Sequence, residues 1–291
     1  METKQFAVIG GDKRNIYLSG LLKKSGMSVR MFGFDKFGLE KIAESYNLYE
    51  AIDGADYIIG PTPLVCNNLS LNAIYSSRDI LADDLFRLIK PTQIFFGGHI
   101  KEEVFAIAEK YAVNCVDMLK WEELALLNAI PTAEGAIKIA MENTEFTLHG
   151  ARVMIVGFGR IGKLLCKMLM GIGASVHPVV LERHEAAAAK SFGYSPIMYE
   201  KMDARISGMD VIFNTVPEIL FDRHNIKHIS KDCLFVDVSS VPHGINSRFA
   251  KEAGIKVLFA GSLPGAVAPK SAAKYIQESI YHYLDELKGG G

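Results

Sequence analysis

The sequence predicts an α/β protein made of two doubly wound parallel-sheet domains. Short apolar runs alternate with helical patterns in the N-terminal half, and the alternation restarts at Ala151. Strands that are apolar throughout and separated by helices are typical of a parallel sheet covered on both faces. The chain has 291 residues, enough for two domains of ordinary size. We expect a first domain over residues 1–130, a second over residues 131–291, and a cleft between them.

The first domain is expected to be flavodoxin-like, with five strands and helices between them. Its expected strands are Phe6–Gly10, Ser28–Gly33, Ala55–Gly60, Gln93–Gly97 and Val113–Met118, and its expected helices are Asn15–Lys24, Leu39–Tyr46 and Lys101–Tyr111. A longer helical stretch, Glu122–Asn143, follows as the connector. We expect it to be interrupted at Pro131, with Thr132 as a plausible N-cap of the helix that resumes.

The second domain is expected to bind a dinucleotide. Its expected strands are Val153–Val156, Ser175–Val180, Asp210–Asn214, Leu234–Val238 and Lys256–Phe259, and Pro269–Glu286 is its last helix, which can instead pack back on the first domain. The first strand runs directly into G-x-G-x-x-G over Gly157–Gly162, followed by an amphipathic helix. Strand, glycine turn and helix in this order form the Rossmann fingerprint, in which the helix N-terminus faces the phosphates.

Each position of the glycine turn has an expected role. Gly157 allows the tight turn, Gly159 lets the backbone approach a pyrophosphate, and Gly162 lets the helix pack closely on the strand. We expect the intervening Phe158, Arg160 and Ile161 to contact the cofactor as well.

The choice between NADP and NAD depends on the end of the next strand, Val179-Val-Leu-Glu-Arg-His184. The usual place of the acidic ribose ligand falls at about Val180, which cannot accept a hydrogen bond. Glu182 lies within the looseness of the motif, and Arg183 and His184 suit a 2′-phosphate. We therefore expect NADP, with NAD as the alternative.

Polar residues at the other strand ends are further candidates, because ligands of doubly wound sheets lie outside the C-terminal ends of the strands. In the second domain these candidates for cofactor contacts are Asn214, Thr215, Pro217, Asp237 and Ser239. In the first domain they are Asp12, Arg14, Thr62 and His99. Lys270 opens the last helix, where its charge opposes the helix dipole, and an anionic ligand would explain it.

Composition limits the other function classes. Hydrophobic residues make up 49% of the chain, charged residues 22%, and the net charge is -1. The chain has no excess of basic residues that would suggest nucleic acid or a membrane surface as a partner. The four cysteines are scattered, which suits a reducing cytosol and argues against a structural zinc site. We expect no metal, no signal peptide and no apolar run long enough to span a bilayer, and therefore a cytoplasmic protein.

Four motifs together resemble the family formed by the A subunits of dipicolinate synthase, found in spore-forming bacteria. They are Gly10-Gly-Asp-x-Arg14, Ile130-Pro-Thr-Ala-Glu-Gly135, Gly157-Phe-Gly-Arg-Ile-Gly162 and Leu263-Pro-Gly-x-Val-Ala-Pro-Lys270. The first and last of these are specific, whereas many dehydrogenases share the glycine fingerprint. The resemblance covers nearly the whole chain. It implies a two-domain arrangement similar to that of alanine dehydrogenases and of formate- and glycerate-type dehydrogenases.

The resemblance also implies an activity, which is the oxidation of dihydrodipicolinate to dipicolinate during sporulation. It implies a second subunit that resembles flavoprotein decarboxylases, and we expect a homo-oligomer. The chain departs from the family at Leu181 and Val241, where the family tends to carry arginines. These departures affect the cofactor choice and one carboxylate contact.

A pyridine dicarboxylate needs cationic or N–H donors, for which we nominate Arg14, Lys270 and the Thr132 region. For proton removal the candidates are Glu134 and His99. One alternative function is a 2-hydroxyacid or alanine dehydrogenase, although Pro242-His243 is the only Pro-His pair and no convincing Arg, Glu and His set accompanies it. The other alternative is a non-catalytic protein that binds NAD(P) and needs its partner for chemistry.

Overall fold

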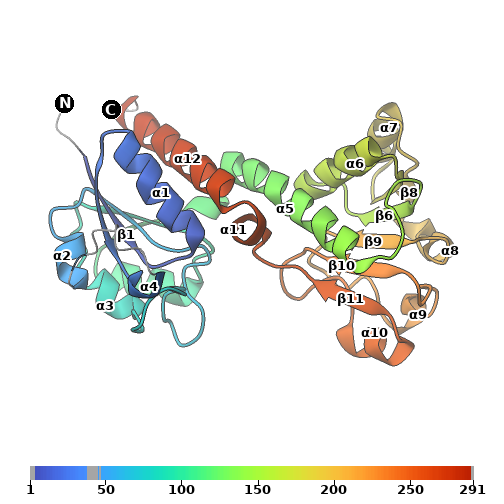
Figure 1. Cartoon of the computed structure of the whole chain (residues 1–291), viewed down its shortest axis with the longest axis horizontal. Coiled ribbons are helices and arrows are strands. Elements are labelled where there is room, and N and C mark those ends of the chain that lie inside the picture. The colour runs from blue at the N-terminus through green and yellow to red at the C-terminus, as the bar shows by residue number, and fades with distance from the viewer. Residues whose placement is uncertain (1–3, 38–44, 46, 290–291) are drawn as a thin grey trace. The chain divides into compact units, whose positions relative to one another are not determined.

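Two parallel sheets, each buried on both faces, form the framework of the computed structural model, which describes residues 4–37, 45 and 47–289 (Figure 1). The described residues separate into two units. One contains the chain up to Leu127 together with the residues from Ala268 onward, and the other is Asn128–Val267. The domain boundary expected near residue 130 falls inside one helix, α5 (Glu122–Asn143). The predicted fold class, two doubly wound parallel sheets, is confirmed.

The first sheet has the strand order β2-β1-β3-β4-β5, and all its strand pairs are parallel. The strands are β1 (Gln5–Ile9), β2 (Ser28–Phe32), β3 (Tyr57–Ile59), β4 (Ile94–Gly97) and β5 (Asn114–Asp117). The helices are α1 (Lys13–Lys24), α2 (Leu48–Ile52), α3 (Ala82–Phe86), α4 (Glu102–Lys110) and α12 (Pro269–Gly289), with short 3-10 turns at Asp35–Phe37 and Met118–Lys120. All five expected strands are present. The expected helix at Leu39–Tyr46 lies outside the described residues, apart from Ser45.

Alternate residues of β1 explain why both faces of this sheet are covered. Phe6 and Val8 share one core cluster with α1 and α12, whereas Ala7 and Ile9 share another with α2, α3 and α4. Successive side chains of a strand point to opposite faces, so a continuous apolar run must be buried on both. The last helix therefore packs on the first sheet's unit, where it lies beside α1 (Figure 1).

The second sheet has the strand order β11-β10-β9-β6-β7-β8, again with parallel pairs. The strands are β6 (Arg152–Val156), β7 (Ser175–Val180), β8 (Ile197–Met198), β9 (Val211–Asn214), β10 (Leu234–Asp237) and β11 (Lys256–Phe259). The helices are α6 (Arg160–Ile172), α7 (Arg183–Ser191), α8 (Asp203–Ile206), α9 (Arg223–Ile226), α10 (Ser247–Ala253) and α11 (Leu263–Val267), with a 3-10 turn at Tyr199–Lys201. In chain order this is the 3-2-1-4-5-6 arrangement of dinucleotide-binding sheets. The expected strands did not include β8.

Helix α5 runs without a break through Pro131, so the predicted interruption is wrong. Thr132 lies inside the helix, and its hydroxyl donates to the carbonyl oxygen of Asn128 at 2.7 Å instead of capping a helix start. Ala133, Ala136 and nearby apolar residues of this helix pack in the second unit's core. This packing keeps the helix continuous despite the hydrogen bond that proline cannot make.

Helix α5 also has the length and composition of a membrane-spanning helix, with a mean hydropathy of 1.2 in its apolar window. This finding differs from the expectation that no apolar run is long enough to span a bilayer. About half of that window, 44%, is already buried inside the protein. A buried core helix meets the same criteria, so α5 is weak evidence for a membrane.

Candidate functional site

The glycine turn between β6 and α6 has the backbone that the fingerprint requires. Gly157 has a φ of +97°, and a Cβ there would lie 2.5 Å from Oγ1 of Thr215. A Cβ on Gly162 would lie 2.1 Å from the carbonyl oxygen of Gly157. Both glycines are therefore needed by the fold itself, because any side chain would collide with neighbouring atoms.

Gly159 differs from its two neighbours in the motif. It is the N-cap of α6, no side chain caps the helix at this point, and a Cβ there would meet no described atom within 4 Å. The fold thus leaves open space in front of the first N–H groups of a thirteen-residue helix. Such a helix start attracts anions through its free donors and its dipole, so the turn fits a pyrophosphate.

A pocket of about 250 Å³ lies beside this turn. It is lined by Val156, Gly157 and Phe158 from the turn, Val179, Val180, Leu181 and Glu185 around the end of β7, and Tyr199, Val216, Glu218 and Leu220. Dinucleotide-binding sheets hold the ribose at this strand end. Of the three side chains expected to reach the ribose, Glu182, Arg183 and His184, none lines the pocket, and all three are exposed. Glu185 was not among the predicted residues.

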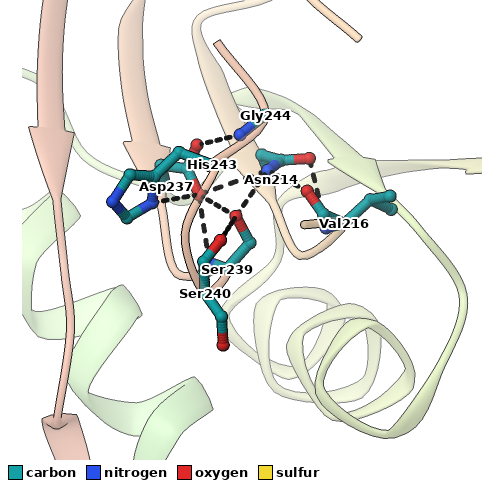
Figure 2. Close-up of polar contacts among 7 residues, drawn as sticks. All are labelled: Asn214, Val216, Asp237, Ser239, Ser240, His243 and Gly244. Carbon is teal, nitrogen blue, oxygen red and sulfur yellow. Dashed lines mark hydrogen bonds and ion pairs between the residues drawn. The ribbon is translucent and has the colours of Figure 1, made fainter. Parts of the chain in front are cut away.

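The predicted residues at the ends of β9 and β10 form a buried network (Figure 2). Asn214 and Asp237 are both fully buried. The Asp237 carboxylate accepts hydrogen bonds from the Ser239 hydroxyl at 2.6 Å, the Ser239 backbone N–H at 3.0 Å, the Gly244 N–H at 2.7 Å and the Asn214 amide at 3.2 Å. Asn214 also donates to the carbonyl oxygen of Val216 at 2.9 Å.

This network holds the two loops in place at the C-terminal edge of the second sheet. A Cβ on Gly244 would lie 2.1 Å from the Asn214 amide nitrogen, which makes this glycine essential to the packing. Nδ1 of His243 lies 3.8 Å from Asp237 (Figure 2). Thr215 donates to the Val156 carbonyl oxygen at 2.9 Å. The buried carboxylate and amide therefore shape the loops, whereas the predicted contact Pro217 is exposed.

Three predicted substrate residues meet at the C-terminal edge of the first sheet. Arg14 is only 5% exposed and forms an ion pair with Asp12. The same guanidinium donates to the carbonyl oxygen of Thr62, after β3. Asp12 also caps α1 by accepting from the Arg14 backbone N–H at 2.8 Å. In the strand order β2-β1-β3, the strand order reverses between β1 and β3, and these residues follow those two strands. Ligands of doubly wound sheets usually bind at this point.

His99 follows β4 at the same edge and is exposed, with a φ of +53°. Its backbone N–H donates to Asp117 at 3.0 Å, so the carboxylate at the end of β5 fixes the loop. The preceding Gly98 packs on Thr62, since a Cβ there would lie 2.4 Å from the threonine hydroxyl oxygen. The loop that carries His99 is therefore packed through Gly98 on Thr62, whose carbonyl oxygen accepts from Arg14.

The remaining candidates are divided between the units. Lys270 is exposed at the start of α12, in the same unit as Arg14. Thr132 and Glu134 belong to α5 within the second unit, and Glu134 is exposed.

Three of the four cysteine thiols are unsuited to nucleophilic chemistry. Burial raises the pKa of the thiols of Cys115, Cys166 and Cys233 to about 12, which keeps them protonated and unreactive at neutral pH. Within the part of the chain that the structure describes, no three His, Cys, Asp or Glu side chains are grouped to hold a metal ion.

Two family models match the chain, one in each unit. Residues 5–119 match the N-terminal domain of the A subunit of dipicolinate synthase. Residues 138–259 match the shikimate / quinate 5-dehydrogenase family. The second match covers the glycine turn, the pocket and the buried network.

Individual relatives extend the match over the whole length. The A subunit of dipicolinate synthase from Bacillus subtilis is 26% identical over 98% of this chain and 97% of its own. The crystal structure of that Bacillus subtilis protein has a TM-score of 0.88 with 25% identity, covering 100% of this chain and 99% of its own. The corresponding Bacillus halodurans structure has a TM-score of 0.89 with 26% identity, covering 98% and 99%.

An L-alanine dehydrogenase shares the fold, with a TM-score of 0.68 at 13% identity over 99% of this chain and 90% of its own. The chain therefore resembles the A subunit of dipicolinate synthase along its whole length, and with the dehydrogenase match of its second unit this resemblance supports an NAD(P)-dependent oxidoreductase, as the sequence predicted.

Proposed function

We propose that this protein oxidises dihydrodipicolinate to dipicolinate during sporulation, together with a second, flavoprotein-like subunit. The observation that carries the proposal is the similarity to the A subunit of dipicolinate synthase over 98% of the chain, with both units included. We further propose a cytoplasmic homo-oligomer, whose size light scattering on the purified protein would measure.

The second unit is proposed to hold the cofactor. The open space at Gly159 and the uncapped start of α6 suit a pyrophosphate, and the pocket beside β7 suits the adenosine end. A bound nicotinamide accepts a hydride at C4. The sequence favoured NADP through Arg183 and His184, with NAD as the alternative.

The first unit is proposed to hold at least one substrate carboxylate. Two observations indicate that helices α1 and α12 run in the same direction. Gln277 donates to Ser25, just after α1, at 3.1 Å. Tyr281, further along α12, lines a pocket with Met27, beyond the end of α1. The start of α12 therefore points to the sheet edge where α1 begins.

Lys270 and Arg14 then lie at similar levels of two neighbouring helices. Lys270 is seven residues before Gln277 and Arg14 is eleven before Ser25. At 1.5 Å per residue, their levels along the helix axes differ by about 6 Å. Exposed Lys270 is the side chain that we propose to bind a substrate carboxylate. Arg14 instead holds the same edge of the first sheet in place through its ion pair with Asp12.

Oxidation removes a hydride and a proton from the dihydropyridine ring. The stabilisation gained when the ring becomes aromatic drives the reaction. The protein's task is then to position the ring and accept the proton. His99 is the proposed base in the first unit because it is exposed in the loop whose Gly98 packs on Thr62, and Glu134 is the proposed base in the second. Thr132 has its hydroxyl engaged with Asn128, so its proposed contribution is indirect.

A spectrophotometric assay tests the proposal. The dihydrodipicolinate-forming reaction is run with NAD or NADP and this chain, with and without the flavoprotein-like subunit, and the ultraviolet absorbance of dipicolinate is followed. We expect cofactor-dependent product. Activity only with both subunits would favour a non-catalytic role for this chain alone, and turnover of lactate or alanine instead would replace the proposed substrate.

A further inference from the structure

The pocket beside the glycine turn contains two acidic side chains and no basic one. Among its eleven lining residues, the charged ones are Glu185 and Glu218. Arg183 and His184 are close in sequence, yet they belong to the exposed start of α7 and do not line the pocket. NADP differs from NAD by a 2′-phosphate, which adds about 1.5 to 2 negative charges near neutral pH. The charges of the pocket therefore oppose NADP.

Glu185 is held at the place where dinucleotide-binding sheets put the ribose ligand. Its Oε2 accepts hydrogen bonds from the backbone N–H groups of Leu181 and Glu182, both at 3.2 Å. These bonds fold the side chain back over the end of β7 and fix it there. The hydrogen bonds that Glu185 accepts within the described part of the chain use Oε2, so Oε1 is available to accept from a ligand.

The neighbouring residues explain why this role falls to Glu185. The strand end itself carries Val180 and Leu181, whose side chains cannot accept a hydrogen bond, and Leu181 is 69% exposed. A carboxylate in the first turn of a helix is favoured by the helix dipole, which keeps Glu185 in this position. The first turn of α7 thus supplies the acceptor that the end of β7 lacks.

We infer that Glu185 accepts the ribose 2′-hydroxyl and excludes a 2′-phosphate, so that the protein prefers NAD to NADP. This inference rests on the proposed nicotinamide cofactor and reverses the preference that Arg183 and His184 suggested. Glu218, in the loop after β9, adds a second negative charge to the lining of the same pocket.

Fluorescence titrations with NADH and NADPH test the inference on the full chain. The wild type is expected to bind NADH at least about tenfold more tightly, a difference of about 1.4 kcal/mol. Glu185→Gln keeps an oxygen for the two backbone N–H groups, so the fold is expected to survive. It should weaken NADH, strengthen NADPH and bring the two dissociation constants to within about threefold of each other. Leu181→Arg should raise the NADPH affinity by roughly tenfold, since it adds a cation at the strand end.

Two control variants separate this effect from a general change of charge. Glu182→Gln removes the same charge from a side chain outside the pocket, and Arg183→Ala removes the cation that the sequence favoured. Neither is expected to change the ratio of the two affinities. A wild type that prefers NADPH, or a ratio that moves with Arg183→Ala and not with Glu185→Gln, overturns the inference while leaving a nicotinamide cofactor in place. Binding of neither cofactor overturns the proposed function as well.

Discussion

Arg14 donates from Nε and Nη2 to both carboxylate oxygens of Asp12, over distances of 2.9 to 3.1 Å. Because Asp12 is also the N-cap of α1, one carboxylate orients the helix and neutralises a buried cation. A substrate carboxylate would have to share this arginine with Asp12. The pair is therefore part of the fold at the edge where we propose the substrate to bind.

Arg14→Met should consequently destabilise the protein, by about 2 kcal/mol, since it removes charge-assisted hydrogen bonds to Asp12 and the Thr62 carbonyl. Urea unfolding of the variant and the wild type measures this. If stability is unchanged while the KM for the dihydropyridine rises, Arg14 acts as a free carboxylate clamp and its pairing with Asp12 is unimportant.

Gly159→Val and Gly162→Val should have opposite consequences. Position 159 has open space, a φ of −82° and a ψ of −156°, so the valine variant should fold and lose cofactor binding. Position 162 has the Gly157 carbonyl oxygen 2.1 Å from a Cβ, so that variant should lose about 3 kcal/mol of stability or fail to fold. Thermal unfolding and NADH titration distinguish them. Normal cofactor binding by a folded Gly159→Val protein would remove the pyrophosphate from this turn.

Lys270→Met should leave stability within about 0.5 kcal/mol of the wild type, because the lysine is exposed and forms no ion pair with the described residues. The KM for the dihydropyridine should rise, and NADH affinity should stay the same. Lys274→Met is the matched control on the same helix, where Lys274 pairs with Glu278. Equal KM values for the two variants and the wild type would mean that Lys270 does not touch the substrate.

The sequence predicted the strands and the glycine turn because both depend on local information. A run such as β6 is apolar whichever fold surrounds it, and the positions of Gly157 and Gly162 directly reflect steric needs. Strand β8 has two residues, too few for any periodicity to show. Pro131 was misread as a break, since one missing hydrogen bond is outweighed by the core contacts of α5, which the sequence does not display.

The site was harder to predict because its polar groups are arranged by tertiary contacts. Asn214 and Asp237 lie at strand ends as expected, yet both are fully buried and their side chains are hydrogen-bonded to each other. Glu185 was missed because its carboxylate reaches the strand end only once the start of α7 has been placed. The sequence signal for Glu185 was its position three residues after the N-cap Glu182, which is the spacing of a capping box.

Asp237→Asn should be strongly destabilising, although the change is nearly isosteric. The fully buried carboxylate accepts from three different residues, and an amide group would place donor hydrogens against at least one of these donors. We expect a loss of about 2–4 kcal/mol. Ser239→Ala, which removes one hydroxyl that donates to Asp237 and accepts from Asn214, should cost about 1 kcal/mol. Urea unfolding ranks the two variants, and an equal effect of both would show that Asp237 is not the centre of the network.

The acid sensitivity of the second unit should depend on Asp210. Its carboxylate accepts from the Arg152 side chain at 2.9 Å and from the Arg152 backbone N–H at 2.7 Å, and these bonds lower the pKa of Asp210 below its usual 3.8. A depressed folded-state pKa stabilises the fold above the unfolded value, and the stabilisation disappears as the pH falls through the folded value.

Asp210→Asn should therefore cost about 1 kcal/mol at pH 7, and the difference from the wild type should shrink as the pH falls below the usual carboxyl pKa of 3.8. Urea unfolding at pH 7, 5 and 3 measures both quantities. Asp285→Asn is the matched control, since Asp285 pairs with Lys288 at 3.1 Å while 73% exposed, and it should change stability little at any pH. A constant difference between Asp210→Asn and the wild type across the three pH values would show that the hydrogen bonds, and not the ionised carboxylate, stabilise the strand ends.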